Sequence, residues 1–190
     1  DNDGRPDSAE LAEGTDPLDA QSFCSGPGCL DLIFDNDGIA ITAEGHGESV
    51  ALQVDGKLLV SGLRNNDMTL VRFTPDGSLD TSFGISGYVD LAPGSFYHGE
   101  AVAVQTDGRI VVAGDGNSTF SLASFDNNGS PDNSFGSGTG KVSSALGTGW
   151  DAAIQPDGKI VVVGDQWNGL NGDFSVARYK PDGTVDTSFD

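Results

Sequence analysis

Apolar side chains alternate with polar ones along this chain, with a period of two. Val50, Leu52 and Val54 fall on one face of the first such stretch, and Val102 and Val104 share a face in the next. Successive side chains of a β-strand point to opposite faces, so this period predicts strands rather than helices.

Each alternating strand is expected to lead into a second strand that is apolar on both faces, as in Lys57–Val60 and Lys159–Val163. Such a pattern fits a strand buried on two sides. An Asp-Gly pair separates the two strands and predicts a hairpin with a type I′ turn. A third strand is expected at Met68–Phe73 and a shorter fourth one at Tyr88–Leu91. Four antiparallel strands in about fifty residues make one propeller blade.

Two phrases recur three times along the chain. The first reads Gln-x-Asp-Gly-Lys/Arg, and its aspartates Asp55, Asp107 and Asp157 stand 52 and then 50 residues apart. The second begins with Asp/Asn-Gly and ends in phenylalanine. The three copies of the second phrase are Asp76–Phe83, Asn128–Phe135 and Asp182–Phe189. A fixed period of this length predicts a stacked or radial array of one supersecondary unit.

The phenylalanines that end the second phrase are predicted to be buried at equivalent places, because one aromatic residue recurs at one phase of a polar segment. They are Phe83, Phe135 and Phe189. Gly28–Phe34 is interpreted as a degenerate copy of the same phrase, so the phase of the repeats is predicted to begin near Phe34. Ile39–Ile41 is then expected to be the fourth strand of a preceding blade, pairing either with Phe174–Tyr179 or with strands elsewhere.

The predicted fold is all-β: a propeller-like array of about three four-stranded antiparallel blades, open or truncated, because three blades are too few for an ordinary ring. Residues 1–23 are expected to form a short irregular acidic segment and linker. The repeats occupy 24–190, with a partial repeat at 24–48 and further repeats at 49–100, 101–150 and 151–190. The 28 glycines and 8 prolines agree with short strands and tight turns. A β-solenoid is disfavoured, because its coils are shorter and mostly parallel.

The chain carries a formal net charge of −20, from 29 acidic and 9 basic residues. Nucleic acid and anionic membranes would repel such a surface, so neither is expected as a partner. Excess carboxylate suits calcium, whose ligands are oxygens, but solubility in a salty or extracellular medium explains the same excess. No membrane span or signal peptide is recognisable, and the chain does not begin with methionine, so it is expected to be a fragment or a processed product.

The first ten residues fit part of the calcium-loop pattern D-x-[DN]-x-[DN]-G-x5-E. Asp1 and Asp3 fall at loop positions 3 and 5, and Glu10 falls at position 12. Arg5 would supply a backbone carbonyl, and Asp7 a direct or water-mediated contact. The sequence therefore predicts a calcium site with these five residues; the alternative is a disordered acidic linker.

A second match to the loop pattern is rejected. Asp35-Asn36-Asp37-Gly38 with Glu44 has the right spacing, but loop position 1 would be Ile33, which has no side-chain oxygen.

Several other polar residues are interpreted as structural. His46-Gly47-Glu48 and His98-Gly99-Glu100 occupy equivalent positions, but the third copy is Thr148-Gly149-Trp150, so loop residues kept by duplication are preferred over a metal or acid–base site. Aspartates at one position of the second phrase are predicted to be turn and capping residues rather than ligands. They are Asp80, Asp132 and Asp186. No nucleophile–base arrangement, phosphate loop or cofactor motif is recognisable.

The two recurring phrases resemble the bacterial delta-sixty repeat, over roughly residues 28 to 190. This resemblance implies a propeller-like blade in a large secreted or surface-attached protein, and no established reaction comes with it. The second repeat departs from the pattern, with Ser124 in place of an arginine and Pro131-Asp132 in place of Leu-Asp.

The stretch Asp1–Pro17 resembles a thrombospondin type 3 repeat of the kind found in bacterial surface proteins, which implies calcium loops in a stiff connector. Cys24 and Cys29 are separated by four residues and offer too few ligands for structural zinc. Taken with the extracellular resemblance, a disulfide is favoured over free thiols.

The sequence thus predicts a non-enzymatic, calcium-binding module of a bacterial cell-surface or secreted protein, acting as a scaffold or adhesion segment. Its expected partners are calcium and a surface glycan or protein, without membrane insertion. The alternative is a carbohydrate or small-ligand binding propeller that uses the loops at Phe96–His98 and Gln166–Asn168. A hydrolase ranks third, because no residue set supports it.

Overall fold

The computed structural model describes residues 33–42, 45–65, 67–91, 98–116, 119–144, 147–167 and 169–189. The chain divides into two compact units. The larger comprises Thr42–Pro75 and Leu79–Asp190 and contains every described strand, while the other extends to Ile41 and includes Asp76–Ser78. A search of the described residues finds no helix long and apolar enough to cross a membrane.

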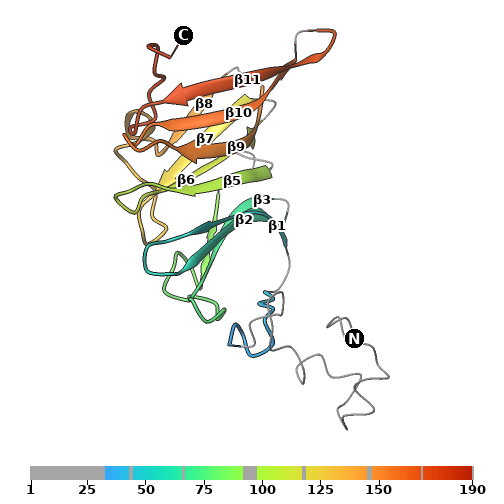
Figure 1. Cartoon of the computed structure of the whole chain (residues 1–190), viewed down its shortest axis with the longest axis vertical. Coiled ribbons are helices and arrows are strands. Elements are labelled where there is room, and N and C mark those ends of the chain that lie inside the picture. Colours follow the sequence, from blue (N-terminus) through green and yellow to red (C-terminus); the bar gives the residue numbers. More distant parts are fainter. Residues whose placement is uncertain are drawn as a thin grey trace. The chain divides into compact units, whose positions relative to one another are not determined.

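Three antiparallel sheets make up the larger unit (Figure 1). The strand orders are β1-β2-β3-β4, β5-β6-β7-β8 and, within the described residues, β11-β10-β9. The bounds are β1 His46–Leu52, β2 Leu58–Arg64, β3 Asp67–Phe73, β4 Tyr88–Asp90, β5 His98–Val104, β6 Ile110–Gly116, β7 Thr119–Phe125, β8 Lys141–Ser144, β9 Thr148–Ile154, β10 Ile160–Trp167 and β11 Gly172–Tyr179. A 3₁₀ turn, Gly136–Gly138, precedes β8. The predicted all-β array of antiparallel blades is confirmed, although the third sheet has three described strands instead of four.

The hairpin that opens each sheet does not contain the predicted type I′ turn. The amide of Gly56 donates to the carbonyl of Gln53 at 2.9 Å, and Gly56 has a φ of 82°. Asp55 is not among the described residues with positive φ. The loop is therefore a type I turn followed by a left-handed glycine, the common three-residue hairpin loop. In the third repeat Pro156 occupies the second position of this turn, where proline is favoured.

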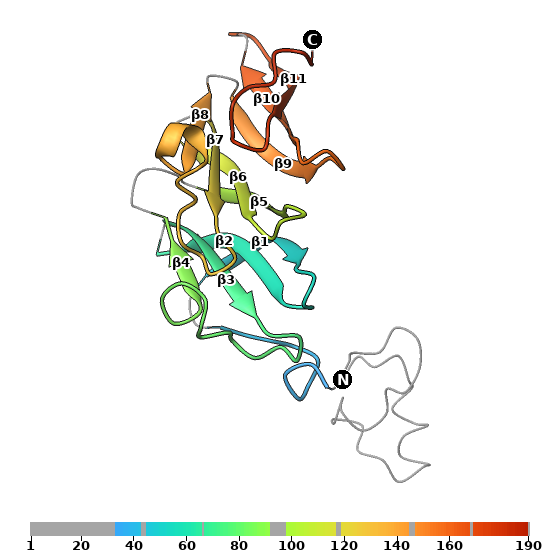
Figure 2. The same ribbon diagram turned by 90° about the vertical axis from the view of Figure 1, so that its left-hand side faces the viewer.

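The second sheet is buried on both faces, because β6 alternates its side chains between two hydrophobic cores. Ile110 and Val112 belong to the core shared with the first sheet, and Val111 and Ala113 belong to the core shared with the third. All four side chains are fully buried. Figure 2 shows the three sheets one after another, with the first strands β1, β5 and β9 on the same side. The prediction of a strand buried on two faces is confirmed for β6. It is wrong for β10, where Val162 is buried but Val163 on the opposite face is 41% exposed.

Two of the three anchor phenylalanines are fully buried, each beneath a turn of the following repeat. A Cβ atom added to Gly129 would lie 3.0 Å from the ring of Phe83, and one added to Gly183 would lie 2.7 Å from the ring of Phe135. Glycine is needed in these turns for space, and also for their φ values of 87° and 82°. Each Asp/Asn-Gly turn is thus the cover of the preceding repeat's phenylalanine.

The prediction that Phe189 is buried like the other two anchors is wrong. Its side chain is 44% exposed, whereas Phe83 and Phe135 are 0% exposed. Within the described residues a glycine turn lies against the rings of Phe83 and Phe135, and none is recorded against the ring of Phe189.

In the smaller unit, Phe34 and the residue after it contact an Asp-Gly turn in the same way as the anchor phenylalanines and the residues after them do in the larger unit. The amide of Asp35 donates to the carbonyl of Asp76 at 2.6 Å, as the amide of Gly84 donates to the carbonyl of Asn128 at 2.9 Å. Phe34 lies beside Gly77, with its ring 3.2 Å from the place of an added Cβ atom. These contacts support the prediction that the repeat phase begins near Phe34. Residues 39–41, predicted as a strand, belong to none of the described strands.

Candidate functional site

A carboxylate that is buried in the first and third repeats and half-buried in the second recurs at the aspartate of the second phrase. We call each aspartate with its polar neighbours a carboxylate cluster. The clusters are Asp80 with Lys57, Arg72 and Ser82; Asp132 with Arg109, Ser124 and Ser134; and Asp186 with Lys159, Arg178 and Ser188. One cation of each cluster also pairs with the aspartate of its own hairpin, at Lys57–Asp55, Arg109–Asp107 and Lys159–Asp157.

Asp80 uses both of its carboxylate oxygens. Oδ2 accepts from Nε of Arg72 at 2.9 Å and lies 3.1 Å from Nζ of Lys57. Oδ1 accepts from the backbone amide of Ser82 at 3.1 Å and from its hydroxyl at 2.5 Å. The bond to the amide two residues ahead is the turn-capping bond typical of aspartate. The prediction that this aspartate caps a turn is therefore confirmed.

The third cluster has the same geometry. Oδ2 of Asp186 accepts from Nε of Arg178 at 2.8 Å and lies 3.6 Å from Nζ of Lys159. Its Oδ1 accepts from the amide and the hydroxyl of Ser188 at 3.1 and 2.6 Å.

The second cluster has no counterpart of Arg72 on β3 and Arg178 on β11, and other side chains donate to its aspartate instead. Ser124 stands at that position and donates its hydroxyl to Asp132 at 3.2 Å. Arg109, which replaces the lysine of the other repeats, brings its longer side chain to within 3.1 Å of the same carboxylate. One polar atom is left without a partner: Oε1 of Gln105 is buried and accepts no hydrogen bond within the described part of the chain. The equivalent Oε1 of Gln53 faces the arginine of the first cluster at 3.5 Å.

Hydrogen bonding keeps these carboxyls ionised. The Ser82 hydroxyl is the largest cause that holds the pKa of Asp80 far below its ordinary value, Lys57 and Arg72 add to it, and burial opposes it. The pKa of Asp186 is lowered in the same way, chiefly by the hydroxyl of Ser188. For Asp132 burial alone would raise the pKa, but the bonds from its serines and arginine outweigh burial.

The first cluster also joins two repeats. Nη1 of Arg72 donates to the backbone carbonyl of Asn127 at 2.5 Å, and Nε2 of Gln53 donates to the side-chain oxygen of Asn127 at 2.6 Å. The guanidinium lies over the ring of Phe83, 4.4 Å from its centroid. A single arginine therefore contacts the carboxylate and the anchor ring of its own repeat and the backbone of the next one.

Acid should reduce the stability that the first cluster contributes to the fold. Comparison of the wild type with Asp80→Asn isolates this contribution. The pKa of Asp80 is lower in the folded chain, so the unfolded chain binds more protons in acid and stability rises with pH across this window. The contribution is complete above the ordinary value of 3.8 and is lost as pH falls toward the folded pKa. The Tm of the wild type should exceed that of Asp80→Asn most above about pH 5, and the difference should shrink below about pH 4. Calorimetric melts of both proteins check this, and a difference that is constant with pH would contradict it.

The described side chains of the histidine–glutamate pairs are those of His46, Glu48 and Glu100. His46 and Glu48 are exposed on β1, and Glu100 lies on β5. The side chain of His98 lies outside the part that can be described. A search of the described residues finds no group of three or more His, Cys, Asp or Glu side chains that could hold a metal ion.

The described part of the second match to the calcium-loop pattern contains a capped turn. The side chain of Asp37 caps its own turn by accepting from the amide of Ile39 at 2.9 Å. Ile33 is exposed, and Glu44 lies outside the described residues.

The predicted calcium ligands all lie outside the described residues, as do both cysteines. They are Asp1, Asp3, Arg5, Asp7 and Glu10, with Cys24 and Cys29 beyond them. Of the loops assigned to ligand binding, Phe96, Tyr97 and Asn168 lie outside the described residues. His98 begins β5, and Gln166 and Trp167 end β10, but of these three only the side chain of Gln166 is described, and it is exposed. These assignments stay predictions.

A family described as "Domain of unknown function (DUF5122) beta-propeller" matches residues 53–83, 105–135 and 155–189. The chain belongs to this family. Each DUF5122 segment begins at the glutamine of the first phrase and ends at the anchor phenylalanine, so each contains one hairpin, one carboxylate cluster and one anchor ring. The propeller-like repeat is thereby established, while the finer resemblances to delta-sixty and thrombospondin type 3 repeats stay predictions. No curated protein matches the chain.

Proposed function

We propose that this chain is a non-enzymatic, extracellular repeat module that acts as a scaffold or adhesion segment of a bacterial surface or secreted protein and binds calcium through its N-terminal segment. The observation that carries the scaffold role is the carboxylate cluster. The polar side chains that all three repeats share are bonded to one another, and in the first repeat also to the following repeat.

The electrostatics of the clusters support a structural role over a catalytic one. A general acid or base works best with a pKa near the working pH. The pKa values of Asp80 and Asp186 are instead far below their ordinary value, and their lone pairs already accept from serine, lysine and arginine. Such carboxylates hold turns and strands in place.

Calcium binding rests on the sequence of the N-terminal segment. Alternate carboxylates at Asp1 and Asp3, a glycine at the bend and a distant Glu10 supply the oxygen ligands that a hard cation requires. The extracellular location is supported by the resemblance of this segment and of the repeats to those of bacterial surface proteins.

Calorimetric titration of the chain with calcium chloride tests the proposal. Binding should be detected, and Asp3→Ala and Glu10→Ala should each weaken it at least about tenfold, or about 1.4 kcal/mol, because each removes a carboxylate ligand. Asp37→Ala is the matched control, since that aspartate belongs to the rejected second pattern and should leave the affinity unchanged. Absence of calcium heat, or binding that survives both substitutions, would make the segment an acidic linker.

A further inference from the structure

We propose that Asn128 is a site of spontaneous chemical modification, and that its conversion to isoaspartate loosens the contact between the first and second repeats. The site consists of Asn128 and Gly129, in the turn that follows β7. The reaction consumes one water molecule and releases ammonia, and it needs no enzyme. The inference is independent of calcium binding and of the extracellular location.

The turn after β7 differs from its equivalents in the residue before the glycine. The other two repeats have an aspartate there, and its carboxylate caps the turn. Oδ1 of Asp76 accepts from the amide of Ser78 at 3.1 Å, and Oδ1 of Asp182 accepts from the amide of Thr184 at 2.9 Å. In both repeats the side chain of this residue is therefore bonded within its own turn.

In the second repeat the cap comes from Asp126 instead. Its Oδ1 accepts from the amides of Asn128 and Ser130 at 2.8 and 2.9 Å. The side chain of Asn128 is exposed, and it makes no hydrogen bond among the described residues. The carboxamide of Asn128 is thus free to turn toward the backbone nitrogen that follows it.

The reaction closes a five-membered ring between the two residues. The backbone nitrogen of Gly129 attacks Cγ of Asn128, and the carboxamide nitrogen leaves as ammonia with the proton of the attacking amide. Glycine has no Cβ atom to hinder this approach. One water molecule then opens the ring. Opening at Cγ gives aspartate, whereas opening at the former backbone carbonyl gives isoaspartate, in which the main chain runs through the side chain.

The equivalent aspartates are poor substrates for this reaction. The hydroxyl and the amide of Thr184 lower the pKa of Asp182, so that this side chain is ionised. An ionised carboxylate has no leaving group comparable to ammonia, whereas the neutral carboxamide of Asn128 has one. Among the three second-phrase turns, the turn of the second repeat is therefore the reactive one.

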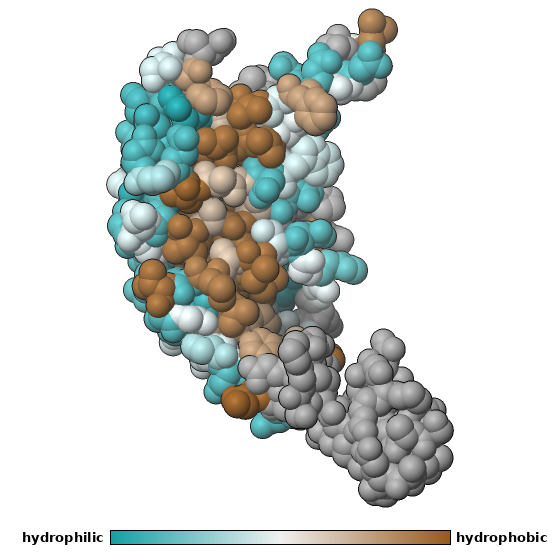
Figure 3. Space-filling view, in the orientation of Figure 1, coloured by the Kyte–Doolittle hydropathy of each residue, from teal (hydrophilic) through white to brown (hydrophobic). Residues whose placement is uncertain are grey.

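The fold slows the reaction without preventing it. The amide of Gly129 donates to the carbonyl of Asp126 at 3.0 Å, and this bond must open before the nitrogen can attack. Figure 3 shows mostly hydrophilic residues at the end of the larger unit where strands β9 and β11 finish, and the turn after β7 occupies that end of its own sheet. Solvated turns open locally at a lower free energy than the whole fold. Conversion should therefore be slower in the folded chain than in the unfolded chain, and still measurable.

The same turn covers the anchor ring of the first repeat. The carbonyl of Asn128 accepts from the amide of Gly84 at 2.9 Å, and Gly129 lies against the fully buried ring of Phe83. Isoaspartate turns this carbonyl into a free carboxylate and adds one methylene group to the main chain before Gly129. The hydrogen bond and the glycine therefore cannot both keep their places.

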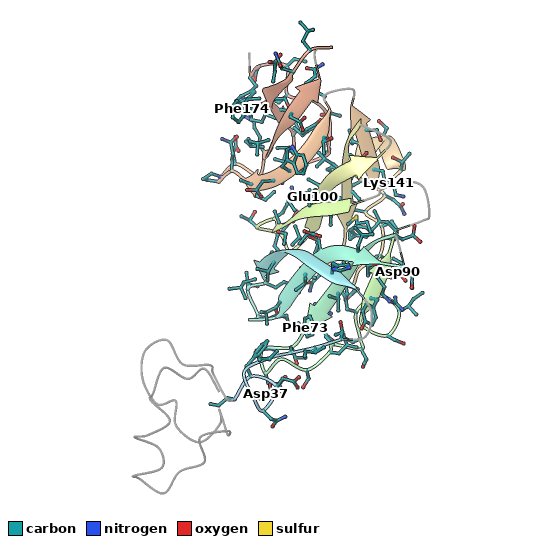
Figure 4. All side chains as sticks on the ribbon, turned by 90° about the vertical axis from the view of Figure 1, so that its right-hand side faces the viewer. Asp37, Phe73, Asp90, Glu100, Lys141 and Phe174 are labelled. Carbon is teal, nitrogen blue, oxygen red and sulfur yellow. The ribbon has the colours of Figure 1, made fainter. Side chains whose placement is uncertain are left out.

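The residue before the site carries the polar contacts of the first carboxylate cluster. Asn127 accepts from Arg72 through its backbone carbonyl and from Gln53 through its side chain. Arg72 directly precedes Phe73, which is labelled in Figure 4 and ends β3. A lengthened turn displaces the acceptors of both donors, so the modification acts on the polar contacts between the repeats as well as on the cover of the anchor ring.

Peptide mapping by mass spectrometry, on the whole chain incubated at mildly alkaline pH, measures the conversion. The peptide with Asn128 should gain the mass of a hydroxyl in place of an amino group and separate into aspartate and isoaspartate forms. The rate should rise about tenfold per pH unit, because the attacking amide must lose its proton. It should rise at least about tenfold when urea unfolds the chain. Asn128→Gln should abolish conversion, since its carboxamide could close only a six-membered ring.

Thermal melts of the separated products measure the structural effect. Chains with isoaspartate at position 128 should melt about 4 °C or more below the unmodified chain, because the turn no longer covers Phe83. Asn128→Asp is the matched control: it has the charge of the product without the added methylene group and should melt within about 2 °C of the wild type. Asn171 also precedes a glycine, but it lies in the β10–β11 loop, so its conversion should leave the Tm unchanged.

Three results would overturn the proposal. A folded chain could remain free of isoaspartate at Asn128 after an incubation that converts this residue completely in the unfolded chain, which would show that the turn does not open. Chains with isoaspartate could melt together with the unmodified chain, which would remove the effect on the repeats. Incubated Asn128→Gln could lose as much stability as the incubated wild type, which would place the damage elsewhere.

Discussion

Phe135→Ala should lower the free energy of unfolding by about 3–5 kcal/mol, whereas Phe189→Ala should lower it by about 1 kcal/mol or less in dilute solution. The two residues end the same repeated phrase, but their surroundings differ. Phe135 is fully buried beneath Gly183 of the next repeat, and its loss leaves a cavity between two repeats. Phe189 is exposed on one side and has the guanidinium of Arg178 over its ring at 4.6 Å. Urea denaturation followed by circular dichroism measures both changes.

Phe83→Ala is the positive control for this comparison. Phe83 is fully buried beneath Gly129, so its loss should resemble that of Phe135. Equal effects at Phe135 and Phe189 would show that the following turn contributes little, and would refute the explanation of the exposed third anchor.

The period of two and the repeated phrases were enough to predict most of the fold. Strands β3 and β4 lie within a residue of the expected ranges, because their alternation is local and turn residues bound them. The turn type was predicted wrongly, because an Asp-Gly pair was taken as a two-residue loop. Pro156 was the available signal, since proline favours the second position of a type I turn.

Burial of the anchors could be predicted only in part, because it depends on a different repeat. The phase of Phe83 and Phe135 within a polar segment correctly marked them as core residues. The same argument failed for Phe189, since a recurring residue type shows what a repeat contains but not what covers it.

The aspartates of the carboxylate clusters were recognised as turn residues, but the bond from the first cluster to the next repeat was not predicted. Asp80 meets Arg72 and Lys57 only because strand pairing brings residues from three parts of the repeat together. A signal was nevertheless present in the sequence: where Ser124 replaces the arginine, Arg109 replaces the lysine. Two coupled replacements around one aspartate indicate a shared partner.

Arg72→Ala should be the most destabilising change at a polar residue, with a loss of about 3–5 kcal/mol in the free energy of unfolding. The substitution leaves the buried Asp80 with one cation fewer, removes the donor to Asn127 of the next repeat and uncovers the ring of Phe83. Breaking a buried ion pair by removing one partner is costly, because the remaining charge stays buried without full compensation. Chemical denaturation of the variant beside the wild type gives the loss.

Two further variants separate the bridge between repeats from the ion pair itself. Arg178→Ala removes the equivalent ion pair of the third repeat, where no carbonyl of a following repeat is described, so it should cost clearly less than Arg72→Ala. Arg72→Lys keeps the charge but has no second nitrogen to reach both Asp80 and Asn127, so its loss should fall between that of Arg72→Ala and zero. If Arg178→Ala cost as much as Arg72→Ala, the bond to Asn127 would contribute nothing. The coupling of adjacent repeats would then rest on their hydrophobic cores alone.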